Sequence, residues 1–310
     1  IRNQESEVSD SKNKRIRITR VHLEEDTGRL IHDPQSGASL VDFNRAGVPL
    51  MELVTEPDLR TGEEVKAFGE ELQRILRYIG ASDADMEKGQ MRVEVNISLR
   101  EMSASSPRES ALGTKVEIKN INSFKYAADA VDYETKRQTV VLERGEKVVQ
   151  ETRGWNEHKG ESFSQRSKEE AHDYRYFPEP DLPPLRISQE MIEDIQAKLP
   201  ELPAQKRERF AREYGLEQDT IEVLTREKAL ADYYEKTASE LKEHDKETPE
   251  KPRKNLFRTA ASLMTGDFLR LLRETLVPIE ETLATPENFA ELALFVAEDK
   301  ISNSAAKEVL

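Results

Sequence analysis

The sequence predicts an α+β fold, in which a mainly antiparallel sheet carries helices on one face and is followed by an all-α part. In the first half, segments that alternate apolar and polar side chains are interleaved with long amphipathic helical patterns. Beyond about residue 189 the alternation ends, and short helical patterns rich in Glu, Lys, Leu and Ala replace it. We therefore expect a sheet-containing domain at 1–197, a helical domain at 198–284 and the start of a small helical tail domain at 285–310.

Composition narrows the class of protein. The net charge is −14, from 47 basic and 61 acidic residues, which argues against nonspecific nucleic-acid binding but not against a local contact. Residues 12–15 and 251–254 are basic patches that could make such a contact or could be solvated surface. The sequence has no Cys, which excludes thiolate chemistry in this stretch and suits a cytosolic protein. No apolar run approaches the length of a membrane span.

The first predicted elements are strands followed by a capped helix. Residues 15–25 read as a strand, and 39–56 read as two extended pieces on either side of a Gly-Val-Pro turn. Thr61 and Glu64 form a capping box, and Gly80 stands where a helix would stop. The apolar stripe of this helix comprises Val65, Phe68, Leu72, Ile75, Leu76 and Ile79.

Residues 91–100 alternate strictly for ten positions and therefore predict a strand with one apolar and one polar face. The apolar face enters a core. The polar face offers two guanidiniums, a carboxylate, an amide and a hydroxyl, a set able to hold a cation, a phosphate and a polar substrate. Its members are Arg92, Glu94, Asn96, Ser98 and Arg100.

A further strand at 115–119 breaks at an Asn-Ile-Asn junction, and Ser123 can cap the helix that follows. Amino groups of Lys and the N-terminus of a helix both suit a phosphate. The alternative is ordinary helix capping beside solvated lysines. The side chains concerned are Lys115, Glu117 and Lys119 on one strand face, with Asn120 and Asn122 at the junction.

Acidic residues after the first strand suggest a metal site. His22 and Glu24 share a strand face, and Glu25 and Asp26 lie at the turn that follows. Adjacent carboxylates repel one another unless a cation or solvent offsets the charge. A hard ion such as Mg²⁺ takes carboxylate oxygens and keeps waters that a phosphate can replace. An acidic surface turn is the alternative.

Glu52 lies inside the apolar run 48–54, where a carboxylate is costly unless it is paired or bound to a metal. An ion pair with a residue such as Arg45 is the structural alternative.

The remaining motifs limit the possible chemistry. The mixed segment 165–178 could close over a site or clamp the end of a domain, and the Pro-rich segment 177–184 should run extended. No Walker-type loop, GxGxxG, HExxH or serine-elbow motif is present. Any nucleotide chemistry would therefore use carboxylates, a metal, Lys and Arg.

Six ordered motifs resemble the GatB family, the B subunits of the glutamine-dependent aspartyl/glutamyl-tRNA amidotransferase, over roughly residues 15–310. They are HLEEDTG at 22–28, DFNRAGVPLMELVTEPD at 42–58, MRVEVNISLR at 91–100, GTKVEIKNINSF at 113–124, QETRGW at 150–155 and RSKEEAHDYRYFPEPDLPPL at 166–185.

The resemblance implies a carbon–nitrogen ligase that works with the A (glutaminase) and C subunits of the amidotransferase, in the cytoplasm or an organellar matrix. The glutaminase releases ammonia from glutamine. The GatB protein binds misacylated Glu-tRNA(Gln) or Asp-tRNA(Asn) and uses ATP and Mg²⁺ to phosphorylate the side-chain carboxyl, and ammonia then displaces phosphate. A carboxylate becomes a good electrophile only when one oxygen leaves as phosphate, and such transfer needs positioning and charge neutralisation.

The resemblance also implies roles for particular residues. The family's metal-binding carboxylates fall on Glu25 and Glu52, with Glu24 and His22 nearby. We expect Glu94, Lys115 and Lys119 to be catalytic. We expect the nucleotide and substrate to contact Arg92, Asn96, Ser98, Asn120 and Asn122.

The chain is expected to be an excerpt. It lacks the N-terminal strand that supplies the other half of the metal site in the family and most of the tail domain, so by itself it should be inactive. Two other readings stay open: a noncatalytic tRNA-binding scaffold, and an unrelated metal-dependent phosphotransferase. Glu52 discriminates among them: in the complete assembly, loss of ATP-dependent amide formation with intact tRNA binding in Glu52→Gln would support the amidotransferase interpretation.

Overall fold

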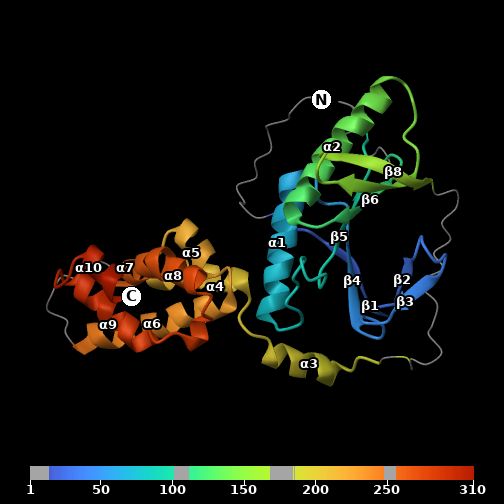
Figure 1. Ribbon diagram of the computed structural model, residues 1–310. Helices are drawn as coiled ribbons and strands as arrows, with labels where there is room; N and C mark the ends of the chain where they lie inside the picture. Colours follow the sequence, from blue (N-terminus) through green and yellow to red (C-terminus); the bar gives the residue numbers. More distant parts are fainter. Residues whose placement is uncertain (1–13, 101–111, 168–183, 185, 248–255) are drawn as a thin grey trace. The chain divides into compact units, whose positions relative to one another are not determined.

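The computed structural model describes residues 14–100, 112–167, 184, 186–247 and 256–310 (Figure 1). Within these residues the chain divides into two compact units. The first unit draws on 1–67, 95–120 and 124–166, and the second on 68–94, 121–123 and 167–310. Most of the predicted loop at 101–112, of the Pro-rich segment 177–184 and of the segment 165–178 lies outside the described residues, as does the basic patch at 251–254. The domain boundaries at 197 and 284 stay predictions.

The first unit begins with two antiparallel pairs of strands. Strand β1 (Ile18–Glu25) pairs with β4 (Pro49–Thr55), and between them β2 (Arg29–His32) pairs with β3 (Ser39–Asp42) as a hairpin. The strand at 15–25 and the two extended pieces at 39–56 are thus confirmed. Strand β2 was not predicted, because a four-residue strand with every side chain exposed carries no alternation.

A second sheet has the order β5-β6-β7-β8. Its strands are β5 (Val93–Ile97), β6 (Val116–Ile121), β7 (Glu151–Asn156) and β8 (Glu161–Ser167). The α+β class is confirmed, although β6 and β7 run parallel because helix α2 (Phe124–Glu143) carries the chain back between them. The alternating run 91–100 is a strand over only its five central residues.

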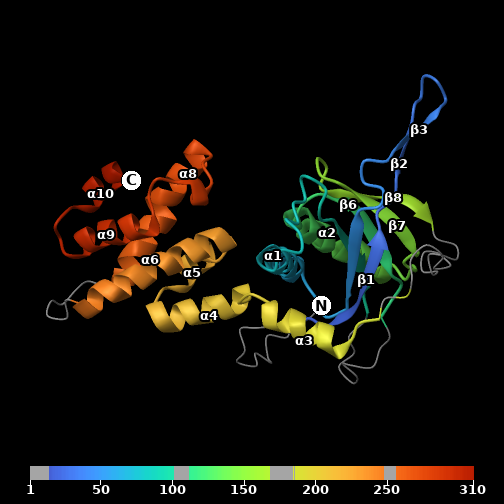
Figure 2. The same ribbon diagram turned by 90° about the horizontal axis from the view of Figure 1, so that it is seen from below.

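Helix α2 covers one face of this sheet, as Figures 1 and 2 show. Val116 and Ile118 of β6 are fully buried, and so are Ala127 and Ala130 of α2. The intervening residues of β6 therefore point to the opposite face. That opposite face is the one that the sequence marked as polar.

A buried ion network joins α2 to strands β7 and β8. The carboxylate of Glu134 is fully buried and accepts hydrogen bonds from Arg137 Nε at 2.9 Å, Gln138 Nε2 at 2.9 Å and Ser162 Oγ at 3.2 Å. Arg153 of β7 lies 3.8 Å from the same carboxylate, donates to Ser162 Oγ at 2.7 Å and is paired with Glu151 at 2.6 Å. The hydrogen bond to Glu134 raises the pKa of Arg137. Two guanidiniums thus balance two carboxylates, of which Glu134 is fully buried and Glu151 is partly buried.

Helix α1 (Gly62–Tyr78) has the predicted start and stop. The backbone N–H of Glu64 donates to Thr61 Oγ1 at 3.2 Å, and Gly80 has a φ of +69°. A Cβ on Gly62 would lie 2.5 Å from the carbonyl oxygen of Ala128 in α2, so glycine permits the close approach of these two helices. In a complete capping box the Glu64 carboxylate would accept from the N–H of Thr61. Here it accepts from the N–H of Arg60 and from Lys14 Nζ.

The second unit is all helical beyond residue 189, as predicted. Its helices are α3 (Gln189–Lys198), α4 (Pro203–Tyr214), α5 (Gln218–Leu224), α6 (Lys228–Glu247), α7 (Leu256–Leu263), a π-helical turn (Met264–Phe268), α8 (Leu269–Thr275), a 3₁₀ turn (Ile279–Glu281), α9 (Pro286–Ala297) and α10 (Asn303–Val309). None of the helices in the described residues is both long enough and apolar enough to cross a membrane.

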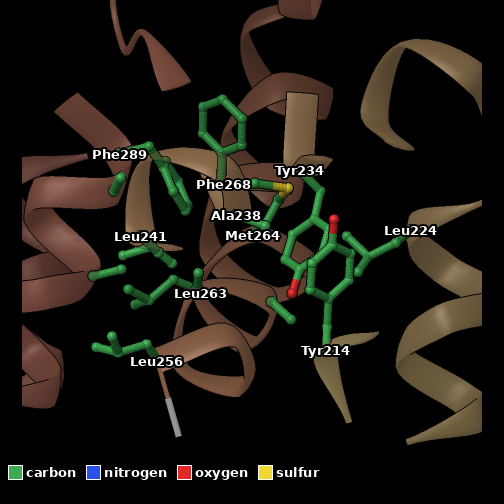
Figure 3. Close-up of a cluster of buried hydrophobic side chains, with 14 of the residues drawn as sticks. Tyr214, Leu224, Tyr234, Ala238, Leu241, Leu256, Leu263, Met264, Phe268 and Phe289 are labelled. Carbon is green, nitrogen blue, oxygen red and sulfur yellow. The ribbon is translucent and has the colours of Figure 1, made fainter. Parts of the chain in front are cut away.

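The core of the second unit is built around aromatic side chains (Figure 3). Tyr214 and Tyr234 meet edge to face with ring centroids 5.5 Å apart, and Phe268 and Phe289 lie 5.2 Å apart. Burial raises the pKa of Tyr234, whose hydroxyl donates to the carbonyl of Phe257 at 3.1 Å. Each buried hydroxyl of this kind needs a partner, and the backbone supplies it.

Ion pairs fasten the second half of α1 to α4 and α5 within this unit. Arg207 of α4 donates to Glu71 at 2.7 Å, and Arg74 lies 3.3 Å from Glu222. The hydroxyl of Tyr78 donates to the carbonyl of Thr225 at 2.9 Å. Ion pairs and a hydrogen bond therefore hold the end of α1, in addition to apolar packing.

We expect Glu134→Ala to lower the free energy of unfolding of the first unit by about 3–5 kcal/mol, because it removes the buried carboxylate that accepts from Arg137, Gln138 and Ser162. The measurement is urea unfolding followed by circular dichroism. Lys136→Ala, an exposed neighbour on the same helix, should stay within about 0.5 kcal/mol of wild type. A Glu134→Ala protein as stable as the control would contradict a role for the network.

We expect a pH-dependent contribution from Asp58. The Arg17 guanidinium donates to both Asp58 oxygens, at 2.7 and 3.0 Å, and these hydrogen bonds hold the pKa of Asp58 well below its usual range. A depressed folded-state pKa gives stability that is fully present above the unfolded value of about 3.9 and is lost as the pH falls through the folded value. Asp58→Asn should therefore lower Tm at pH 7, and the deficit should shrink below about pH 4.

The control for this experiment is Asp132→Asn, an exposed carboxylate on α2. Its Tm should follow wild type over the whole pH range. A deficit in Asp58→Asn that stayed constant down to about pH 3 would show that the charge of Asp58 does not contribute.

Candidate functional site

Strands β1 and β4 bring together three side chains able to bind a metal. His22 and Glu52 are paired across the two strands, with His22 Nδ1 3.9 Å from Glu52 Oε2. Glu24 lies two residues beyond His22 on the same face of β1. One potential ligand atom from each of these three residues lies within 4.8 Å of the others.

This group fits a divalent cation. It offers two carboxylates and one imidazole, and three protein ligands leave coordination positions for water or phosphate. The side chains of His22 and Glu52 are 35% and 39% exposed, so an ion could reach them from solvent. The premise that Glu52 is a costly buried carboxylate is therefore wrong, because a short two-stranded sheet leaves this side chain half in water.

Glu25 takes a different direction from the other predicted ligands. Successive residues of a strand point to opposite faces, which separates Glu25 from His22 and Glu24. Its Oε1 lies 3.5 Å from the position that a Cβ on Gly47 would occupy. Glu25 is not among the three residues grouped above, and a metal role for it stays a prediction.

The turn after β1 is an ordered structure. The backbone N–H of Asp26 donates to the carbonyl of Val48, and the N–H of Gly47 donates to the carbonyl of Asp26 at 3.0 Å. Arg45, the alternative partner for Glu52, donates to the Asp26 carboxylate at 2.8 Å. These bonds fix where β1 ends and β4 begins, and so they hold the metal-binding group in register.

The open face of the four-stranded sheet carries the second set of predicted residues. On β5, Glu94 and Asn96 are exposed, whereas Val95 between them is buried. On β6, Glu117 and Lys119 lie opposite the buried Val116 and Ile118. Three more predicted residues flank these strands in the chain, namely Arg92, Ser98 and Lys115.

Glu117 orients Lys119, a role that the sequence did not indicate. Thr152 of β7 pairs with Glu117 in the parallel ladder, and its hydroxyl donates to Glu117 Oε2 at 2.9 Å. Lys119 Nζ lies 3.5 Å from Glu117 Oε1. A buried hydroxyl thus holds a carboxylate, and the carboxylate attracts the amino group of Lys119. Only the register of β6 and β7 reveals this chain of contacts.

Asn120 changes the direction of β6. Its φ is +62°, a left-handed conformation that few residues other than glycine adopt and that Asn tolerates best. Because of it, alternation breaks: Asn120 is exposed where a regular strand would bury it, and Ile121 is buried instead. Lys119 and Asn120 are therefore both presented outside the core, beside Asn122 at the start of α2.

Gly154 of β7 lets β8 come close on this face. A Cβ there would lie 2.6 Å from both Phe163 Cζ and Gln165 Nε2. Gly154 is paired with Lys119 in the parallel ladder, so these β8 side chains lie beside the row that holds Lys119. Gly154 and Trp155 lie inside β7, and the sequence alone does not indicate this close approach to β8.

Two family models match the chain. Residues 3–193 match the one described as the GatB/GatE catalytic domain, and residues 232–310 match the one described as the GatB domain. The first of these matches covers more than half of the chain.

Curated proteins similar to this chain are named as members of the same family. The B subunit of the aspartyl/glutamyl-tRNA(Asn/Gln) amidotransferase of Caldicellulosiruptor saccharolyticus is 46% identical over 98% of this chain and 60% of its own length. The protein of that name from Thermodesulfovibrio yellowstonii is 47% identical over 96% of the chain and 58% of its own length. The one from Thermosynechococcus vestitus is 46% identical over 97% and 57%. The chain thus spans less than two thirds of the length of these relatives.

We expect Asn120→Val to destabilise the first unit by about 1–3 kcal/mol, because a β-branched side chain is strained at positive φ. Asn120→Gly should be tolerated, because glycine adopts this conformation freely. Urea unfolding of the two variants checks both expectations. If glycine were as destabilising as valine, the side chain of Asn120 rather than its backbone conformation would be the source of stability.

Proposed function

We propose, given that the chain belongs to the GatB/GatE catalytic domain family, that it is the part of a tRNA-dependent amidotransferase that activates a carboxyl group with ATP. The names of its relatives support aminoacylated tRNA as the substrate class and a multi-subunit enzyme as the setting. The proposed substrates are Glu-tRNA(Gln), Asp-tRNA(Asn) or both, and the proposed partners are the glutamine-hydrolysing A subunit and the C subunit. The reaction would take place in the cytoplasm or in an organellar matrix.

The observation that carries the proposal is the group of His22, Glu24 and Glu52 on paired strands. These residues fit Mg²⁺, which would neutralise phosphate charge and orient phosphate oxygens when bound. Neither the bound ion nor ATP is needed to hold the ligands, because backbone pairing of β1 and β4 sets their spacing. Glu25 would act from the other face of β1, in contact with substrate or with the rest of the protein.

The polar face of the second sheet would hold the nucleotide and the aminoacyl group. Lys115 and Lys119 would bind phosphate oxygens as point charges, and Glu117 would keep Lys119 in place. Glu94 and Asn96 would hydrogen-bond polar groups of the substrate. The neighbouring residues Arg92, Ser98, Asn120 and Asn122 would complete this surface.

The chemistry follows from these assignments. The substrate carboxylate attacks the γ-phosphoryl group of ATP, so that an acyl phosphate forms and ADP leaves. Ammonia then attacks the acyl carbon, and phosphate departs to leave the amide. The protein contributes alignment and positive charge, which supply most of the rate enhancement in phosphoryl transfer.

The helical part beyond residue 198 would contact the tRNA by complementarity of shape, because a chain of net charge −14 gives little nonspecific attraction for nucleic acid.

The experiment uses the full-length protein in complex with its partner subunits. We expect Glu52→Gln to reduce ATP-dependent amide formation on misacylated tRNA by at least about 100-fold, because an amide replaces a charged ligand. The affinity for tRNA should change less than twofold. Glu63→Gln, an exposed carboxylate of α1, is the matched control and should keep full activity.

A second readout separates metal binding from turnover. Titration of the protein with Mn²⁺, followed by electron paramagnetic resonance, should show a site that Glu52→Gln and His22→Ala weaken. Full activity of Glu52→Gln would refute the proposal in favour of a structural carboxylate. Loss of tRNA binding with intact ATP turnover would instead favour a scaffold role for this strand pair.

A further inference from the structure

The β2–β3 hairpin, residues 29–42, projects from the rest of the first unit, as Figure 2 shows. At its tip the N–H of Asp33 donates to the carbonyl of Ala38, and the N–H of Gly37 donates back to the carbonyl of Asp33. The Asp33 carboxylate accepts from the N–H of Gln35 and the hydroxyl of Ser36. Gly37 takes the left-handed conformation that the turn requires, with a φ of +67°. The tip is therefore closed by its own hydrogen bonds.

The base of the hairpin is fixed as well. Gly28 leaves room for Phe43 and Val41, whose side-chain carbons lie 3.3 and 3.4 Å from where its Cβ would be. Arg45 and Asp26 are paired across the base at 2.8 Å. Since β1 ends at Glu25 and β4 begins at Pro49, the base of the hairpin is continuous with the strands that carry the metal-binding group.

Both faces of this hairpin are apolar and exposed. Leu30 pairs with Val41 on one face, and Ile31 pairs with Leu40 on the other. These four side chains are between 43% and 61% exposed, and Phe43 at the base is 70% exposed. A two-stranded hairpin is marginally stable in water, and it normally needs a third layer on at least one face. A hairpin with exposed aliphatic side chains on both faces could bury them in a cleft whose two walls contact the two faces.

The charge of the segment favours protein over RNA as the occupant of both faces. Residues 26–45 carry three carboxylates, from Asp26, Asp33 and Asp42, against two guanidiniums, from Arg29 and Arg45. Hydrogen bonding by Ser36 and Gln35 lowers the pKa of Asp33, so the tip stays negative. The tip, residues 33–38, has one carboxylate and no Lys or Arg, so it offers no cation to phosphate, whereas an apolar cleft with a basic end would accept its shape and charge.

We propose that the β2–β3 hairpin inserts into an apolar, basic-ended cleft of another protein of the amidotransferase assembly. The inference rests on the proposed function, which supplies the assembly. Docking of the hairpin would hold the ends of β1 and β4, and so it would link the presence of the partner to the geometry of His22, Glu24 and Glu52.

The first experiment measures accessibility in the full-length protein, both by itself and in the complete assembly. Leu30→Cys and Leu40→Cys place a thiol on each face, and Leu283→Cys, at a position that is 96% exposed, is the control. Maleimide labelling is read by mass spectrometry at the peptide that carries each thiol. We expect assembly to slow labelling of both hairpin thiols at least tenfold and to leave the control unchanged.

Other results would overturn the proposal. Protection already present in the isolated full-length protein would mean that its own chain, or a second copy of it, covers the hairpin. Protection that requires tRNA rather than partner subunits would mean that the hairpin contacts RNA. Equal labelling with and without partners would mean that the hairpin docks nowhere in the assembly, even if amide formation itself is normal.

The second experiment tests affinity. The double variant Leu30→Ser with Leu40→Ser should raise the Kd for the partner subunits at least tenfold, as expected when buried apolar anchors are lost. Leu283→Ser should leave the Kd unchanged, and thermal unfolding should show that both variants fold. An unchanged Kd in the folded double variant would overturn the inference. If no assembly forms with wild-type protein, the proposed function fails instead, and the two failures are thereby distinguished.

Discussion

The buried carboxylate of Glu134 is the constraint on which the sheet of the first unit depends. It lies where α2, β7 and β8 meet, and Arg137 and Arg153 balance its charge from a helix and a strand. A buried ion pair contributes little net stability, but removing one partner is costly, so α2 is held against β7 and β8 by contacts that are expensive to break. The polar residues of β6 lie on the other face of the sheet.

The candidate site has two parts, the strand pair β1–β4 and the polar face of the four-stranded sheet, and each part positions its residues in a different way. Backbone pairing sets the spacing of the metal-binding group, whereas Thr152 and Glu117 position Lys119 through side-chain contacts. Exposure differs along this row: Glu94 and Asn96 are exposed, whereas the side chains of Glu117 and Lys119 are only 14% and 26% exposed.

Local pattern predicted the elements whose signal lies within a few residues. Alternation identified β1, β4, β5 and β6, and the Thr61 cap and Gly80 stop marked α1 correctly. Strand β2 was missed because all four of its side chains are exposed, and β8 was missed because its sequence ESFSQRS contains a single apolar residue. The parallel pairing of β6 with β7 was also missed, since it depends on the path of α2.

The sequence by itself determined the family, the fold class and the residue types of the site, because ordered motifs and periodicity are properties of the chain alone. Tertiary structure alone decided which acidic residues meet. It placed Glu52 opposite His22, beside Glu24, because the pairing register of β1 with β4 is set between strands. It also decided that Glu117 lies between Thr152 and Lys119, and that Asn120 bends β6, because these depend on cross-strand register and backbone conformation.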